Sequence, residues 1–122
     1  MANVLIVDDD PSVRTLIRKL VEREGHRGVV AETGRAALDV LPTGSFNLIV
    51  TDINMPDMDG IELILAVREM GLTVPVIAVS GGGLISAESL LEDAKALGAV
   101  EVLAKPFHLA DAREIIARCL AG

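Results

Sequence analysis

Five short apolar runs recur along the chain at similar intervals, and they predict five strands. They lie at residues 4–7, 27–31, 46–50, 74–79 and 100–104. The first run is almost continuously apolar, which is typical of a parallel strand that is covered on both faces. The run at 27–31 is the weakest of the five, and it indicates an edge strand.

Between these runs, apolar residues recur every three or four positions, which predicts amphipathic helices. In the first helix, Asp10 can cap the amino-terminal end, Pro11 suits the first helical position, and Gly25 suits the carboxyl-terminal end. Asp59 and Glu62 have the spacing of a capping box, which predicts the start of the third helix. The other helices are predicted at residues 34–41, 86–97 and 112–120, and the third ends near Met70.

The alternation of strand and helix, repeated five times, predicts an α/β fold. One doubly wound domain over residues 1–122 accounts for the whole chain, with parallel strands, right-handed crossovers and helices on both faces of the sheet. Ligands bind such folds beyond the carboxyl ends of the strands. The residues that end each strand are therefore the first candidates for a functional site.

The composition excludes several classes of function. The 18 acidic and 11 basic residues give a net charge of −7, and Phe46 and Phe107 are the only aromatic residues; both features argue against a nucleic-acid partner. One cysteine, Cys119, and two histidines exclude a metal site rich in Cys or His. The apolar runs are too short for a signal peptide or a membrane span, so we expect a cytoplasmic protein with no membrane partner.

Acidic, hydroxyl and ammonium groups follow four of the predicted strands. These residues are Asp8, Asp9, Asp10, Asp52, Ser80 and Lys105. Each has an ordinary structural explanation by itself: Asp10 as a helix cap, Ser80 in a turn, and Lys105 as a solvated side chain. Their coincidence at one edge of an alternating fold indicates a shared site instead.

Carboxylates that lie close together repel one another. At about 4 Å and an effective dielectric constant near 20, each pair costs on the order of 4 kcal/mol. A cluster of Asp8, Asp9 and Asp52 is therefore partly protonated or holds a cation, and a site with oxygen ligands alone favours Mg²⁺. Ser80 and Lys105 can then contact two oxygens of a phosphoryl group. The residues thus predict an acid that can be phosphorylated, a metal that offsets charge, and two donors.

These residues stand in segments that resemble the receiver domain of two-component response regulators. The matching segments are residues 4–10, 51–60, 76–81 and 105–107, and the second of them is the most specific. The resemblance covers the whole chain and implies a flavodoxin-like parallel sheet with its strands in the order 2-1-3-4-5. Because the chain ends soon after the last predicted helix, we expect a stand-alone receiver of the chemotaxis-regulator kind.

By this resemblance, Asp52 is the phosphoacceptor, Ser80 is the switch hydroxyl, and Lys105 pairs with the phosphoryl group. The implied Mg²⁺ ligands are Asp8, Asp9, Asp52 and, through its backbone carbonyl, Asn54. The peptide bond between Lys105 and Pro106 is expected to be cis. The donor is a phosphohistidine on a sensor histidine kinase or a phosphotransfer protein. Such a domain is a signalling switch rather than an enzyme, although self-phosphorylation from a phosphodonor and autodephosphorylation are expected.

Two features near the predicted site bear on its output. Val102 stands three positions before Lys105, where the family commonly has Tyr or Phe, so no aromatic ring can rotate there to report phosphorylation. The three glycines at 81–83 follow Ser80 and give that loop unusual backbone freedom. We therefore expect phosphorylation to order this loop and the start of the fourth helix, with a downstream protein target on the fourth-helix face.

Three other functions are weighed against the receiver. A phosphatase of the haloacid-dehalogenase kind would use the acids after the first strand, but it leaves Asp52 and its motif unexplained. A flavodoxin-like cofactor binder would need a phosphate-binding loop at that place, where three aspartates repel the phosphate of FMN. A degenerate receiver that acts as a scaffold without phosphorylation is disfavoured, because every residue that the chemistry needs is present.

Overall fold

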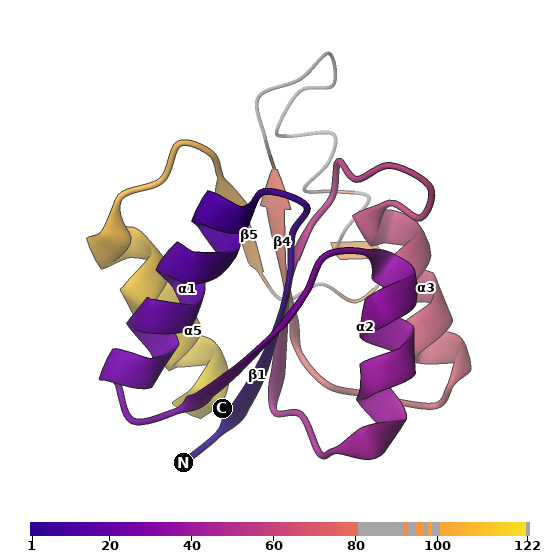
Figure 1. The fold of residues 1–122 in the computed structure, drawn as a ribbon, viewed down its shortest axis with the longest axis horizontal. Coiled ribbons are helices and arrows are strands. Elements are labelled where there is room, and N and C mark those ends of the chain that lie inside the picture. The colour runs from indigo at the N-terminus through magenta and orange to yellow at the C-terminus, as the bar shows by residue number, and fades with distance from the viewer. Residues whose placement is uncertain (81–91, 93–94, 97, 99–100, 122) are drawn as a thin grey trace.

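The computed structural model describes residues 1–80, 92, 95, 96, 98 and 101–121. Within them, strands and helices alternate as the sequence predicts (Figure 1). The elements are β1 (Asn3–Val7), α1 (Pro11–Arg23), β2 (Arg27–Ala31), α2 (Gly34–Val40), the short 3₁₀ helix η1 (Leu41–Thr43), β3 (Leu48–Asp52), α3 (Gly60–Glu69), β4 (Val76–Ser80), β5 (Glu101–Ala104) and α5 (Leu109–Ala121). The predicted fourth helix at 86–97 lies largely outside the described residues, and the predicted glycine loop at 81–83 lies wholly outside them. None of the described helices is both long enough and apolar enough to cross a membrane.

The described strands form one parallel sheet in the order β2-β1-β3-β4-β5, which confirms the predicted order. β1 and β3 are neighbours near its centre, and Val7 pairs with Thr51 at their carboxyl ends. Because Asp8 and Asp52 come next in the two strands, this register carries two carboxylates to the same edge of the sheet. β2 lies at one side of the sheet, as predicted for the edge strand at 27–31.

Two aliphatic cores lie on opposite faces of the sheet. In Figure 1, α1 and α5 cover one face, and α2 and α3 cover the other. Residues of β1 alternate between the two cores: Val4 and Ile6 belong to the α1–α5 core, and Leu5 and Val7 belong to the α2–α3 core. This alternation explains why the strand is apolar at consecutive positions, since both of its faces are covered.

Two strands begin two residues later than the apolar pattern predicts. β3 starts at Leu48 and β4 starts at Val76. Phe46 and Val74 precede these strands, and they are apolar because they pack against the α2–α3 core from the preceding loops. β3 also ends later than the apolar run does. Asp52 is its last residue, so the strand itself positions this carboxylate.

The predicted ends of the first and third helices are confirmed. The side chain of Asp10 accepts a hydrogen bond from the N–H of Ser12 at 2.9 Å, and the side chain of Asp59 accepts one from the N–H of Glu62 at 2.8 Å. These bonds satisfy amide groups that have no partner within α1 and α3. Gly25 follows α1 with a φ of +87°, a conformation that glycine adopts without steric strain.

Candidate functional site

Three carboxylates meet at the carboxyl edge of the sheet. One oxygen from each of Asp8, Asp9 and Asp52 lies within 4.8 Å of the others. Asp8 and Asp52 are buried, with 1% and 4% of their surface exposed, whereas Asp9 is exposed. The fold therefore brings together three of the residues that the sequence assigns to one site. They offer only oxygen atoms, which are the ligands that Mg²⁺ prefers.

Lys105 supplies positive charge at this edge. Its Nζ lies 3.1 Å from Asp8 Oδ2 and 3.2 Å from Asp52 Oδ2. The residue follows β5, and its backbone N–H donates to the carbonyl oxygen of Ser80 at 2.7 Å. The next peptide bond, between Lys105 and Pro106, is cis, which confirms that prediction. One ammonium group thus contacts the carboxylates that follow β1 and end β3.

The charges at this edge shift two pKa values. Burial, followed by the nearby charge of Asp8, raises the pKa of Asp52 above 3.8, although Lys105 and the N–H of Asn54 oppose the rise. Burial alone would lower the pKa of Lys105, but its contacts with Asp8 and Asp52 raise it above 10.5. Lys105 is therefore charged at neutral pH, and it offsets only part of the charge on three carboxylates. The remaining negative charge favours a second cation at this place.

The two carboxylate oxygens of Asp8 have different surroundings. Its Oδ1 accepts a hydrogen bond from the N–H of Asp10 at 2.9 Å. Its Oδ2 is buried, and among the described residues its partner is the Lys105 ammonium group at 3.1 Å. A buried oxygen of this kind, with two further carboxylates beside it, fits a divalent cation.

The loop after β3 holds the second buried carboxylate. Asp52 Oδ1 accepts a hydrogen bond from the N–H of Asn54 at 3.1 Å. Asp57 adopts a φ of +66°, and the N–H of Gly60 donates to the carbonyl oxygen of Ile53 at 2.9 Å. The loop therefore turns back on the end of the strand and holds Asp52 in place. The backbone carbonyl of Asn54, which the sequence assigns to the metal, remains a predicted ligand.

Ser80 is the last residue of β4, which pairs with β3 in the sheet. It is buried, with 4% of its surface exposed, and it lies at the same edge as Asp52.

A further residue, which the sequence pattern did not single out, also reaches this edge. Arg14 Nη1 donates to the carbonyl oxygen of Asp8 at 2.7 Å. No local signal marks this contact, because Arg14 lies on the polar side of the helical stripe and its target is a backbone atom.

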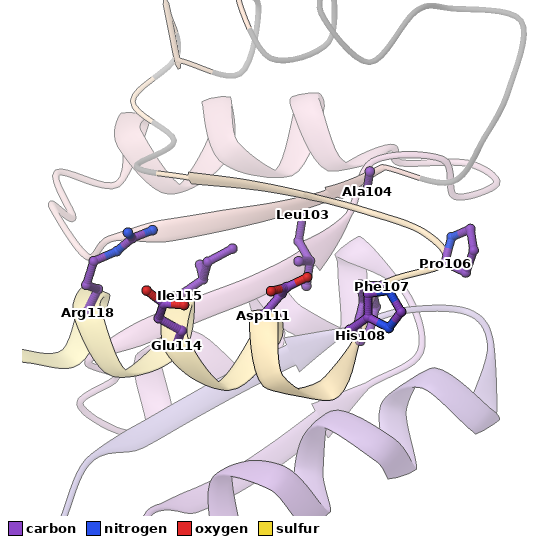
Figure 2. Close-up of a pocket in the computed structure, with 9 residues that line it drawn as sticks. All are labelled: Leu103, Ala104, Pro106, Phe107, His108, Asp111, Glu114, Ile115 and Arg118. Atoms are coloured by element: carbon purple, nitrogen blue, oxygen red, sulfur yellow. The ribbon is translucent and has the colours of Figure 1, made fainter.

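A separate groove of about 380 Å³ lies between β5 and α5 (Figure 2). Its lining residues are Leu103, Ala104, Pro106, Phe107, His108, Asp111, Glu114, Ile115 and Arg118. The ring of Phe107 packs against the α1–α5 core. An ion pair between Arg118 Nη2 and Glu101 Oε1, at 2.9 Å, joins the helix to the strand. The groove includes none of the clustered acids.

Comparison with known proteins gives one family. The family model of the response regulator receiver domain matches residues 4–117. Sporulation initiation phosphotransferase F of Bacillus subtilis (strain 168) is 30% identical over 117 residues, which are 96% of this chain and 92% of that protein. Response regulator receiver protein CpdR of Brucella abortus (strain 2308) is 34% identical over 111 residues, which are 91% of this chain and 90% of that protein.

Other relatives are much longer than this chain. Response regulator protein FleR of Pseudomonas aeruginosa is 32% identical over 121 residues, and the chain spans only 25% of its length. The match therefore concerns one domain of that protein and carries over nothing about the rest of it.

Solved structures have the same fold. The chemotaxis response regulator CheY4 of Vibrio cholerae superposes with a TM-score of 0.88 at 33% identity, over 98% of this chain and 99% of that one. The receiver domain of the Francisella response regulator 1452 superposes with a TM-score of 0.87 at 31% identity, over 99% and 98% of the two chains. The family match runs through the strands that carry Asp8 and Asp52 and through the loop that carries Lys105. The chain therefore belongs to the response regulator receiver domains of two-component signalling systems.

Proposed function

We propose that Asp52 is the phosphoacceptor of this receiver domain. Its phosphoryl group comes from a phosphohistidine on a sensor histidine kinase or a histidine phosphotransfer protein. The observation that carries the proposal is the position of Lys105 Nζ, which contacts both Asp8 Oδ2 and Asp52 Oδ2. A buried carboxylate with a shifted pKa, a lysine partner and two further acids beside it is typical of a reactive site rather than of a packing position.

The place of Asp52 in the sheet favours it over the other two acids. It ends β3, between β1, which leads into Asp8, and β4, which ends in Ser80. A phosphoryl group on Asp52 would therefore have carboxylates on one side and a hydroxyl on the other. Lys105 already reaches its Oδ2, whereas Asp9 is exposed and lies outside the Lys105 contacts described above.

In the proposed phosphoryl transfer, Asp52 is the nucleophile, and Lys105 and Ser80 are the hydrogen-bond donors. A carboxylate oxygen of Asp52 attacks the phosphorus atom, and the new O–P bond forms as the N–P bond of the phosphohistidine breaks. The imidazole keeps the electron pair of the broken bond. Lys105 Nζ and the Ser80 hydroxyl donate to two oxygens of the phosphoryl group and so stabilise its charge. Attack by water on phosphorus later releases phosphate and restores the carboxylate, which is the expected autodephosphorylation.

Mg²⁺ is the cation that we assign to the cluster. The buried Oδ2 of Asp8, which has Lys105 as its ion-pair partner, and the approach of three carboxylates to within 4.8 Å support it. Its proposed ligands are Asp8, Asp9, Asp52 and the backbone carbonyl of Asn54. When bound, the ion offsets the charge that gathers on the phosphoryl oxygens during transfer.

The test is labelling of the purified protein with a small phosphodonor and Mg²⁺, followed by mass spectrometry. We expect one phosphoryl group on the wild type and none on Asp52→Asn. Asp57→Asn is the matched control, because it makes the same change at an exposed position in the loop that follows Asp52. Asn tolerates the left-handed backbone of residue 57, so this variant should label like the wild type. Equal labelling of Asp52→Asn would refute the assignment.

Receiver domains interact with kinases or phosphotransfer proteins and with downstream targets. We propose that the target of this one binds the fourth-helix face after phosphorylation. The absence of an aromatic side chain at Val102 supports this, because no ring in β5 can rotate to report phosphorylation. Amide exchange with and without beryllofluoride tests it: protection should rise over residues 81–88 and change little at Val102. A rise in protection at Val102 with no change over residues 81–88 would contradict this proposal.

A further inference from the structure

The corner between β1 and α1 is held by hydrogen bonds at three points of Asp8. Its backbone N–H donates to the carbonyl oxygen of Ala31 at 3.2 Å, which continues the pairing of β1 with β2. Its Oδ1 accepts from the N–H of Asp10 at 2.9 Å. Its carbonyl oxygen accepts from Arg14 Nη1 at 2.7 Å. The first two bonds are local or belong to the sheet, but the third comes from the next helix.

Arg14 is placed for this contact by the start of α1. The helix is capped by Asp10, and the N–H of Arg14 donates to the carbonyl oxygen of Asp10 at 3.1 Å. The side chain is half-buried and returns six residues along the chain to Asp8. A charged donor at 2.7 Å makes a strong bond to a neutral carbonyl.

This bond fixes the peptide group that joins Asp8 to Asp9. A peptide group is planar, so an oxygen held in place also fixes the direction in which the chain continues to the Cα of Asp9. The Asp9 carboxylate needs this support, because it is exposed and makes no hydrogen bond or ion pair with the described part of the chain. Its approach to Asp8 and Asp52 therefore depends on the direction of the backbone and on its own rotamer, rather than on a side-chain partner.

We propose that Arg14 is a positioning residue for the cation site: its bond to the Asp8 carbonyl orients the Asp8–Asp9 peptide so that the Asp9 carboxylate faces the cluster. This inference rests on the proposed Mg²⁺ site. Arg14 touches neither the phosphoryl group nor the ion in this role. It acts through the backbone of the residues that do.

The experiment compares Arg14→Gln and Arg14→Lys with Arg18→Gln. Arg18 lies one turn further along α1 and is exposed, and within the described part of the chain its ion-pair partner is Glu22 at 3.5 Å, so it controls for the loss of one positive charge. Mg²⁺ affinity is measured on each unphosphorylated protein by titration. Mutating a residue that hydrogen-bonds to a metal ligand typically lowers metal affinity by about 10- to 100-fold. We therefore expect Mg²⁺ affinity to fall by about tenfold in Arg14→Gln and by less than about twofold in Arg18→Gln.

Two further readouts separate positioning from simple charge. The first is amide exchange at Asp10 without metal, because the Asp10 N–H donates to Asp8 within the same corner. Exchange should accelerate in Arg14→Gln and remain unchanged in Arg18→Gln. The second is salt: a loss caused by charge alone disappears at about 1 M salt, where charges are screened within about 3 Å, whereas a loss of positioning persists. Arg14→Lys keeps the charge but loses the planar fork, so it should recover only part of the affinity.

The outcomes distinguish this inference from the function on which it rests. Tight Mg²⁺ binding by Arg14→Gln, full recovery in Arg14→Lys, or a loss that vanishes in high salt overturns the positioning role and leaves the proposed function standing. A wild-type protein that binds no Mg²⁺ and accepts no phosphoryl group overturns the proposed function, and the positioning role with it.

Discussion

At the scale of single residues, Gly60 sets how closely α3 approaches the strand that carries Asp52. A Cβ at this position would press on the carbonyl oxygen of Asp52 and would lie 2.7 Å from the Cα of Ile53. Both are backbone atoms, which cannot rotate away as a flexible side chain can. The N–H of Gly60 also donates to the carbonyl oxygen of Ile53 at 2.9 Å. The close approach therefore requires glycine at this position.

We expect Gly60→Ala to lower the free energy of unfolding by about 1–3 kcal/mol, the usual range for overpacking. Urea unfolding monitored by far-ultraviolet circular dichroism measures it. Gly44→Ala is the control, because a Cβ there meets its nearest atom, Phe46 Cε2, at an ordinary 3.7 Å. Identical urea midpoints for the two variants would show that α3 can move away without cost.

The raised pKa of Asp52 sets the sign of a pH dependence in the stability of the domain. Burial and the charge of Asp8 raise the pKa of Asp52 above 3.8, so the folded state binds its proton more tightly than the unfolded state does. This contribution to stability is complete below pH 3.8 and is lost as the pH rises through the raised pKa. Charged Asp52 therefore destabilises the metal-free fold at neutral pH.

Without Mg²⁺, we expect Asp52→Asn to be more stable than the wild type at pH 7 by about 1 kcal/mol, the common size of a single-site effect. The difference should shrink as the pH falls towards 4, because the wild-type carboxyl then becomes neutral too. Urea titrations at several pH values measure both quantities. A variant less stable than the wild type at neutral pH would mean that the Lys105 contact outweighs the burial of charge.

At the scale of elements, one guanidinium joins three segments at the end of α3. Arg68 Nη1 donates to the carbonyl oxygens of Leu72 and Val74, at 3.1 and 2.9 Å, and Nη2 donates to that of Gly98 at 2.9 Å. Gly98 has a φ of +96°, and a Cβ there would lie 2.9 Å from Arg68 Nε. Arg68 therefore ties α3 to the loop before β4 and to a residue shortly before β5.

We expect Arg68→Lys to lower the free energy of unfolding by about 1–2 kcal/mol, because one ammonium cannot replace a planar fork that serves three carbonyls. Amide exchange should also accelerate in β5. Arg35→Lys, at an exposed position on α2, provides the matched change away from these segments. Unchanged exchange at residues 101–104 in Arg68→Lys would show that other contacts hold the strand.

The elements were predicted well where local chemistry decides them, and less well where packing does. Asp10 and Asp59 mark their helix starts because a cap is a contact between near neighbours. The starts of β3 and β4 were wrong by two residues, because Phe46 and Val74 are apolar for packing rather than for strand pairing. An apolar residue in the sequence does not show whether it pairs within a strand or packs against the core from a loop.

At the scale of the whole molecule, the order of the strands creates the acidic edge. β1 and β3 are 41 or more positions apart in sequence yet adjacent in the sheet, and Lys105 joins Asp52 from 53 positions away. The meeting of the acids could be predicted, because parallel strands end at one edge and the family resemblance supplied their order. The Arg14 contact could not be predicted in the same way, since nothing in the pattern shows which backbone oxygen a side chain will reach.

Repulsion at this edge should govern the stability of the whole domain. We expect metal-free Asp9→Asn to melt at a higher temperature than the wild type, because one of three close charges is removed. At 100 times the dissociation constant, Mg²⁺ should stabilise the wild type by about 2.7 kcal/mol, and at the same concentration it should stabilise Asp9→Asn much less. Calorimetry with and without Mg²⁺ measures both effects.

Asp39→Asn removes the same charge from an exposed position on α2. It should respond to Mg²⁺ as the wild type does. If metal-free Asp9→Asn melts below the wild type, the three carboxylates do not repel one another as the geometry requires.

The two cores contain one benzene ring each: Phe46 packs on the α2–α3 side of the sheet, and Phe107 packs on the α1–α5 side. The chain has no tryptophan or tyrosine to add to them. In a proton NMR spectrum, the ring current of Phe46 therefore shifts the signals of methyl groups in one half of the domain. The ring current of Phe107 shifts the signals of methyl groups in the other half. The protein thus carries a built-in pair of probes, which can reveal whether the two halves melt together or in turn.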